Sequence, residues 1–192
     1  DGTTTDHATP VQVMNGVASI AAGAYYSLIL KTDGTLWACG VNDYGQLGDG
    51  TTTDRATPVQ VMSGVVSMAT SSYHSLILKT DGTLWACGSN SNGQLGDGTT
   101  VNRATPVQVM SGVSSMEAGR YHSFILKTDD TLWACGRNDS GQLGDGTNID
   151  RHTPVKIAEN LSSPMMNGDV NEDNAVNGTD LVALSNIVLG RK

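Results

Sequence analysis

A block of 48 residues is repeated along most of this chain. Residues 51–98 and 99–146 are identical at 36 of 48 positions, and residues 3–50 match residues 51–98 at 37. One tryptophan and one Thr-Pro-Val motif recur at the same place in each block. A fixed period of this length predicts a repeat architecture, in which each unit buries its apolar faces against its neighbours.

Each block predicts about four short strands, because apolar runs alternate with turn residues. In the block 51–98 these runs cover residues 57–62, 65–69, 75–80 and 83–88. Asp81-Gly82 separates the last two runs and predicts a two-residue type I′ hairpin, whose central residues both need a positive φ. The third block has Asp129-Asp130 at this place, and we expect that pair to strain the turn modestly.

A sheet of four antiparallel strands with apolar residues on both faces must be covered on both sides. A β-propeller does this by placing copies of the sheet next to one another, whereas a single-layer solenoid would have one or two strands per turn instead of hairpins. We therefore predict an all-β fold of β-propeller blades, each with four antiparallel strands. The units are expected at residues 3–50, 51–98 and 99–146, with a partial unit at 147–157.

The repeats do not complete a propeller. After three complete units the chain has one extra strand, at residues 154–157. Three blades and one strand leave unpaired edges and exposed faces, which proteins normally cover. We expect either that the repeats are a piece of a larger propeller or that the open blade edges mediate self-association.

Composition argues against nucleic-acid binding, a membrane-spanning helix and disulfide bonds. The chain has 11 Lys and Arg against 19 Asp and Glu, a net charge of −8, and no basic stripe that could follow a nucleic-acid backbone. No stretch reaches the length of a membrane-spanning helix. The cysteines Cys39, Cys87 and Cys135 occur once per block. Equivalent places in successive blocks are too far apart for disulfides, so we expect packed thiols.

No set of residues predicts catalysis. The aspartates of the Asp-Gly turns and of the Gly-Asp-Gly loops recur in every block, which the turn chemistry of the block explains. Glycoside hydrolysis needs a convergent pair of carboxylates, and no serine lies in a nucleophile-elbow motif. His74 and His122 recur in register and are expected to form hydrogen bonds inside the blades. We therefore predict that the chain is not an enzyme.

The blocks differ mainly in two loops, one after the third strand and one before the Ser-Leu-Ile-Leu strand. Loops on a rigid scaffold often carry binding residues, and Tyr and Arg contribute most to the binding energy of interfaces. Tyr44, Arg120 and Arg137 are therefore candidate contacts for a protein or glycan ligand. The alternative is that these exposed positions vary because substitution there costs little.

Two segments carry a resemblance to a known family. Residues 116–126, MEAGRYHSFIL, and residues 33–48, DGTLWACGVNDYGQLG, resemble the signature of the regulator of chromosome condensation repeat. The resemblance covers residues 1–157 and implies a β-propeller, usually with seven blades. The sequence departs from the pattern at Tyr26, which stands in the slot of His74 and His122, and at Ser71, which replaces Gly23 and Gly119.

The last part of the chain has a different pattern. Residues 158–166 are predicted to be a linker. Residues 169–180, DVNEDNAVNGTD, place oxygen side chains at positions 1, 3, 5, 9 and 12, with the carbonyl of Ala175 at position 7. This is the EF-hand calcium layout, except that Asp180 stands where Glu is usual. Apolar residues from Leu181 onward fall on one face of a helix. The pattern predicts a small C-terminal calcium loop followed by a helix, and the alternative is a solvated acidic linker.

Residues 169–190, DVNEDNAVNGTDLVALSNIVLG, resemble one calcium-binding segment of a type I dockerin, whose pattern ends in Asp before a leucine-rich helix. Dockerins normally carry two such segments, and this chain has one. The resemblance implies Ca²⁺ as the cofactor and a cohesin-type protein as the partner of residues 167–192. The implied calcium ligands are Asp169, Asn171, Asp173, Ala175, Asn177 and Asp180. The implied cohesin contacts are Gly178, Thr179, Leu181, Arg191 and Lys192.

Together, the repeats and the two resemblances imply a secreted or cell-surface bacterial protein that does not catalyse a reaction. Its repeats would recognise a protein or a glycan, and its dockerin-like tail would tether it to a cohesin in an assembly that degrades polysaccharides. One alternative is an accessory part of a larger extracellular polysaccharide-degrading enzyme. Another is a protein-inhibitor propeller similar to the β-lactamase inhibitor type.

Overall fold

In the computed structural model, which describes residues 1–159, the chain forms twelve β-strands in three antiparallel sheets. The strands are β1 (Val17–Ala22), β2 (Tyr26–Lys31), β3 (Leu36–Gly40), β4 (Arg55–Met62), β5 (Val65–Thr70), β6 (His74–Lys79), β7 (Leu84–Gly88), β8 (Arg103–Met110), β9 (Val113–Ala118), β10 (His122–Lys127), β11 (Leu132–Gly136) and β12 (Arg151–Ala158). Residues 1–159 contain no helix, and therefore none that could cross a membrane. The all-β prediction is confirmed for this range, and the calcium loop and helix predicted for residues 167–192 lie outside it.

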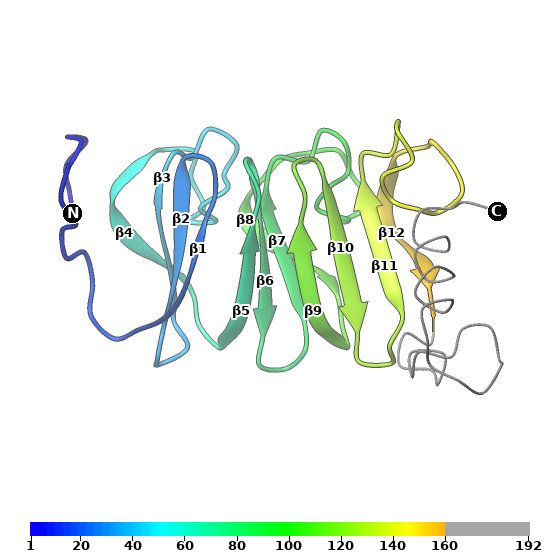
Figure 1. Ribbon diagram of the computed structural model, residues 1–192, viewed down its shortest axis with the longest axis horizontal. Helices are drawn as coiled ribbons and strands as arrows, with labels where there is room; N and C mark the ends of the chain where they lie inside the picture. The colour runs from blue at the N-terminus through cyan, green and yellow to red at the C-terminus, as the bar shows by residue number, and fades with distance from the viewer. Residues whose placement is uncertain (160–192) are drawn as a thin grey trace, which may run out of the picture.

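Within each sheet the four strands follow one another in chain order, and each pairs antiparallel with the next. The second and third strands form a regular hairpin, in which Tyr26 lies opposite Gly40 and Leu30 lies opposite Leu36. The three sheets lie in a row along the long axis of the molecule (Figure 1). The antiparallel blades of four strands that the repeat predicts are therefore confirmed.

The sheets are out of phase with the repeat units predicted from the sequence. They span residues 17–62, 65–110 and 113–158, so the expected extra strand at 154–157 is part of β12, the fourth strand of the third sheet. Each fourth strand pairs with the Leu-Trp-Ala-Cys-Gly strand of the block before it. Residues 8–14 have the same sequence as residues 56–62 but form no strand, because residues 1–159 offer them no such partner.

The hairpin between β2 and β3 is not the predicted two-residue type I′ turn. Its loop is residues 32–34, and of these only Gly34 has a positive φ, of 77°. The Asp33 carboxylate accepts hydrogen bonds from the Thr35 backbone N–H at 3.0 Å and from the Thr35 hydroxyl at 2.6 Å. The Thr35 hydroxyl in turn accepts one from Trp37 Nε1 at 3.0 Å. These bonds favour a three-residue loop, in which one glycine takes the left-handed conformation.

The strain predicted for the third hairpin is present at Asp130, which has a φ of 59° and is the one non-glycine residue of 1–159 with a positive φ. We expect Asp130→Gly to raise the free energy of unfolding by about 1 kcal/mol, because the left-handed conformation costs glycine little. Urea denaturation measures the change. The matched control is Gly82→Asp in the second hairpin, which should lower stability by a similar amount, and unchanged midpoints in both variants would contradict this prediction.

The core lies between neighbouring sheets. Alternate residues of β6 point to opposite sides, so that Ile77 packs against the first sheet while Leu76 and Leu78 pack against the third. The first interface contains Tyr26, Leu28, Leu30, Leu36, Ala38, Leu47, Val65 and Ile77. The second interface contains Leu76, Leu78, Leu84, Ala86, Leu95, Val113, Met116 and Ile125. The middle sheet is therefore covered on both faces by copies of itself, as the apolar pattern predicts.

The three cysteines are free thiols with different exposure. Cys87 and Cys135 are fully buried, and burial raises their pKa to about 12, whereas Cys39 is half-buried at the open side of the first sheet. Since the thiolate is the reactive form, we expect an alkylating reagent at pH 8 to modify Cys39 alone in the folded protein. In urea all three should react. Mass spectrometry of the modified protein checks this, and equal labelling of the three thiols without urea would contradict it.

Candidate functional site

Two connections of each sheet lie together at one end of the molecule, the upper edge in Figure 1. They are the turn between the first and second strands and the long loop between the third and fourth. A backbone hydrogen bond of 2.9 Å joins them in every sheet, with the carbonyl of a tyrosine accepting from the first residue of the loop. These pairs are Tyr25 with Val41, Tyr73 with Ser89 and Tyr121 with Arg137.

The long loop is held by a buried asparagine and an ion pair. The amide nitrogen of Asn42 donates to Asp49 Oδ1 at 3.1 Å, its oxygen accepts from Leu47 N at 3.0 Å, and Arg55 Nε donates to Asp49 at 2.6 Å. Burial alone would raise the pKa of Asp49, but hydrogen bonds from Thr51 and Arg55 hold it below its usual value. The other loops repeat this network with Asn90, Asp97 and Arg103 and with Asn138, Asp145 and Arg151. The repeated aspartates are thus structural, as predicted.

Five side chains from the three sheets meet at this end of the molecule, and we call them the aromatic–arginine cluster. The Tyr44 and Tyr73 rings meet edge to face with their centres 5.5 Å apart, and the Tyr73 and Tyr121 rings stack at 6.0 Å. The guanidinium groups of Arg120 and Arg137 lie over the Tyr121 ring, 5.1 Å and 5.7 Å from its centre. The structure therefore brings together the three candidate contacts of the sequence, Tyr44, Arg120 and Arg137. Their role in binding stays a prediction.

The two arginines of the cluster differ in their electrostatic surroundings. Arg137 donates two hydrogen bonds to the carboxylate of Asp139, at 2.9 Å and 2.5 Å, which raise the pKa of the arginine and lower that of the aspartate. Arg120 forms no ion pair with residues 1–159. Its pKa is raised by a hydrogen bond with Tyr73 and by the Tyr121 hydroxyl. Arg120 therefore supplies the positive charge of the cluster that a ligand can reach.

Sequence comparison between the blocks missed Tyr73 and Tyr121. Both occupy a position that is tyrosine in all three blocks, with Tyr25 as the first member. Because the comparison looked for differences between blocks, it treated this position as structural. Tyr25 is 72% exposed, which shows that this slot lies at the surface. The recurrence of one tyrosine per block in a loop was the signal that could have identified them.

A serine and a histidine meet in the interior, but their setting does not suit catalysis. His74 Nδ1 lies 2.8 Å from Ser71 Oγ, and its Nε2 lies 2.9 Å from Ser123 Oγ on the next sheet. Burial, together with the nearby His122, lowers the pKa of His74 to about 3. An imidazole of this pKa is a weak base, and it is completely enclosed. His74 thus forms the hydrogen bond predicted inside its own sheet, with Ser71, and a further one with Ser123 of the next sheet. For His122 the predicted hydrogen bond stays a prediction.

Metal binding in the described part of the chain has no support, since residues 1–159 hold no group of three His, Cys, Asp or Glu that could share an ion. The calcium ligands predicted at Asp169, Asn171, Asp173, Ala175, Asn177 and Asp180 all lie outside the described residues. So do the cohesin contacts predicted at Gly178, Thr179, Leu181, Arg191 and Lys192. Both sets stay predictions.

Family models recognise the repeated part of the chain. A model described as the regulator of chromosome condensation (RCC1) repeat matches residues 33–78, 81–126 and 129–166. A second model with the same description matches residues 17–46, 65–94 and 113–142. No curated protein sequence matches the chain significantly.

Two solved structures of a yeast protein have the same fold. Prp20p from Saccharomyces cerevisiae, described with its binding to Gsp1p and histones, has 23% identity and a TM-score of 0.68, and the match covers 77% of this chain and 39% of Prp20p. Yeast RCC1 (Prp20) bound to Kap60 has 24% identity and a TM-score of 0.67, with coverage of 77% and 38%. The chain thus spans about two fifths of the length of these relatives.

Proposed function

The chain belongs to the regulator of chromosome condensation (RCC1) repeat family, and from this we infer that its sheets are β-propeller blades that bind another protein. The solved structures of Prp20 are described with protein partners, namely Gsp1p, histones and Kap60. The observation that carries the proposal for this chain is the aromatic–arginine cluster, which gathers three tyrosines and two arginines at one end of the blades.

The cluster has the composition and the rigidity of a binding surface. Tyr and Arg supply much of the binding energy at protein interfaces, and here the rings are already packed against one another, so that little side-chain freedom is lost on binding. Tyr44 is 40% exposed at its edge. Arg120 offers a charge without a carboxylate partner in residues 1–159. We therefore propose that the ligand is a protein segment with an acidic side chain next to an aromatic or apolar one.

Catalysis has no part in this proposal. In residues 1–159 the repeated aspartates are bound within their own loops, and the Ser71–His74 pair is enclosed between sheets. These observations support a recognition module.

Selection of peptides from a displayed random library against the whole immobilised chain tests the proposal. We expect peptides with acidic and aromatic residues, whose affinity falls at least tenfold in the variants Tyr121→Ala and Arg120→Ala. Tyr25→Ala is the matched control, because it removes the same residue from the same slot outside the cluster. Peptides that bind all three variants equally would overturn the proposal. A panel of soluble glycans run in parallel shows whether a sugar binds at this surface instead.

The location of the protein belongs to the same proposal. We propose that it is secreted by a bacterium and tethered through residues 167–192 to a cohesin, in an assembly that degrades polysaccharides. The support is the spacing of oxygen side chains in residues 169–180 and their resemblance to a type I dockerin segment.

A pull-down against a panel of cohesins, with calcium and with chelator, tests the tether. We expect calcium-dependent capture of the whole chain and loss of capture in the double variant Asp169→Ala/Asp180→Ala. Capture that persists with chelator, or no capture in either condition, would contradict the tether while leaving the peptide-binding test unaffected.

A further inference from the structure

Neighbouring sheets are joined by the same polar contact at both internal interfaces. Tyr26 Oη lies 2.9 Å from Ser75 Oγ at the first interface, and His74 Nε2 lies 2.9 Å from Ser123 Oγ at the second. Each serine also donates a hydrogen bond of 2.7 Å to a glutamine carbonyl in the long loop of the preceding sheet. One sheet thus contributes an aromatic side chain and a loop carbonyl, and the next contributes the serine.

Within residues 1–159, no further sheet covers the outer face of the first sheet or that of the third, and these two faces carry the two halves of this contact. In the repeat, Ser27 on the first sheet corresponds to Ser75, and His122 on the third sheet corresponds to His74. Because the sheets lie in a row (Figure 1), these two faces are at opposite ends. One end therefore presents the serine and the other presents the imidazole.

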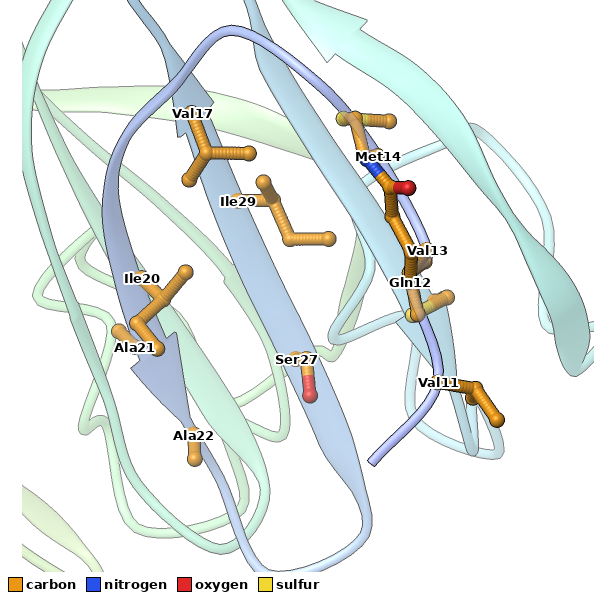
Figure 2. A pocket seen from close by; sticks show the side chains of 11 residues that line it. Val11, Gln12, Val13, Met14, Val17, Ile20, Ala21, Ala22, Ser27 and Ile29 are labelled. Carbon is orange, nitrogen blue, oxygen red and sulfur yellow. The ribbon is translucent and has the colours of Figure 1, made fainter. Parts of the chain in front are cut away.

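The open face of the first sheet is apolar and hollowed. A groove of about 370 Å³ lies on this face. Figure 2 shows Ile29 between the side chains of β1 on one side and those of residues 11–14 on the other. Ile20, which corresponds to the buried Met116, is 72% exposed here. At the internal interfaces, leucines of the preceding sheet fill the corresponding space. The face lacks the layer that would complete its packing.

The open face of the third sheet carries side chains that fit this place. Phe124 and Leu126 on β10 correspond to Leu76 and Leu78, which fill the second interface. Both are only half-buried. The two ends of the molecule are thus complementary, because each repeats one side of an interface that the molecule already contains.

The long loop makes a second contact across each internal interface. A Cβ placed on Gly48 would lie 3.0 Å from Cys87 Sγ, and one placed on Gly96 would lie 2.9 Å from Cys135 Sγ. Gly144 holds the same place in the third loop, where a Cβ would meet no atom of residues 1–159 within 4 Å. The third loop therefore projects from the open face in the way that the other two project onto their neighbours.

We propose that the third sheet of one molecule stacks on the first sheet of a second molecule, with the geometry of the internal interfaces. In this arrangement His122 meets Ser27 of the second molecule, and Phe124 and Leu126 pack on the apolar side chains of its β1 and β2, such as Ile20 and Ile29. The third loop then brings Gly144 against Cys39 of the second molecule. The pair of His122 and Ser27 repeats His74 with Ser123 at the second internal interface, and the approach of Gly144 to Cys39 repeats that of Gly48 to Cys87 and of Gly96 to Cys135.

Residues 1–14 occupy part of this site in the single molecule. Gly2 N donates to Ala56 O at 3.1 Å, and Gly50 and Gly98 form the corresponding bonds at the internal interfaces, at 3.0 Å and 2.9 Å. In the stacked pair, Gly146 of the neighbour takes the place of Gly2. Residues 1–14 form no strand and are almost wholly exposed, and the proposed stacking requires that they leave this place.

The stacking is head-to-tail because it joins two different surfaces. Such contacts either close into a ring or continue as a filament. The three sheets formed by residues 1–159, taken from two molecules, give a ring of six, which is within the range of roughly four to eight blades found in propellers. The expected assembly is therefore a closed pair.

Disulfide trapping with the whole chain tests the proposal. We expect Gly144→Cys to form an intermolecular disulfide with the native Cys39, since the corresponding internal distance of 2.9–3.0 Å suits such a bond. Non-reducing gel electrophoresis after mild oxidation should show a covalent pair, closed by two disulfides, or a ladder of longer species. Either result supports stacking, and the length distinguishes a ring from a filament.

Two variants control the trapping experiment. Gly96→Cys should form an internal disulfide with Cys135 and shows that a cysteine at this positive-φ position is tolerated. Gly144→Cys/Cys39→Ser removes the acceptor thiol and should give no covalent pair. If Gly144→Cys forms no more covalent pair than this control while Gly96→Cys closes its internal bond, the proposal is overturned.

Sedimentation velocity of the unmodified chain gives an independent readout. We expect the sedimentation coefficient to rise with protein concentration, and Ile20→Glu to weaken self-association at least tenfold. Since Ile20 is exposed in the single molecule, this variant should fold normally. A chain that stays monomeric up to the highest soluble concentration would contradict the proposal.

Discussion

Replacing Ile77 with alanine lowers the free energy of unfolding by about 4 kcal/mol, and the same change at Ile29 lowers it by about 2 kcal/mol. The two residues hold the same slot in the second and first blocks. Ile77 is fully buried among leucines of the first sheet, so its truncation leaves a closed cavity. Ile29 lines the open groove, where water can replace the lost methyl groups.

Urea unfolding of both variants at the same low protein concentration measures the difference, since dilution keeps the open face of Ile29 free of a second molecule. The ratio between the two losses is the informative quantity. Equal losses of unfolding free energy in the two variants would contradict this prediction. They would mean that burial of Ile77 between the first and second sheets adds no stability beyond that of Ile29 in its open groove.

Acidification from pH 7 to pH 5 lowers the free energy of unfolding by about 2 kcal/mol through His74 alone. The pKa of this imidazole is about 3 in the folded protein because burial disfavours the charged form, whereas an exposed histidine titrates near pH 6.5. Below pH 6.5 the unfolded chain therefore takes up a proton that the folded chain does not. Stability falls as the pH decreases through this window, and the loss ends near pH 3.

The first block supplies a variant that separates His74 from the other titrating groups. Tyr26 holds the slot of His74, and a Cβ on Gly23 would lie 2.2 Å from the Tyr26 ring, so tyrosine here requires glycine three residues earlier. We expect the double variant Ser71→Gly/His74→Tyr to fold and to lose most of the pH dependence between pH 7 and pH 5.

The single variant His74→Tyr should be destabilised at every pH in this range, because its ring meets the Ser71 side chain. His122, whose pKa burial also lowers, accounts for a smaller slope that remains. Chemical denaturation at several pH values tests both variants, and a slope that the double variant leaves unchanged would show that His74 is not the titrating group.

The blades could be predicted from the sequence because every block must satisfy the same hydrogen bonds and bury the same two faces. The residue at which each sheet begins could not be predicted, because a repeat sets the period of the sheets and leaves their first residue open. Pairing of residues 55–62 with β3 of the preceding block decides this. The hairpin type was also missed, because the side-chain bonds of Asp33 and Thr35 outweigh the usual preference of Asp-Gly.

The candidate site could be predicted only in part. Tyr44, Arg120 and Arg137 were found because the blocks differ there, and their convergence depends on how the sheets stack. Tyr73 and Tyr121 are identical between blocks, so comparison of the blocks gives no contrast at these positions. Their rings stack with centres 6.0 Å apart because they occupy equivalent positions in adjacent sheets. The distance between adjacent sheets cannot be predicted from the sequence.

Contacts between the sheets follow the numbering of the repeat. Tyr26 Oη donates to the carbonyl of His74, 48 residues later, and His74 contacts Ser123, 49 residues later. Removal or duplication of one whole block therefore leaves most inter-sheet contacts with an equivalent partner. Such a change alters the number of blades by one, and each product retains an interface of the same kind. The fold thus permits changes of length that would unfold a protein with a single irregular core.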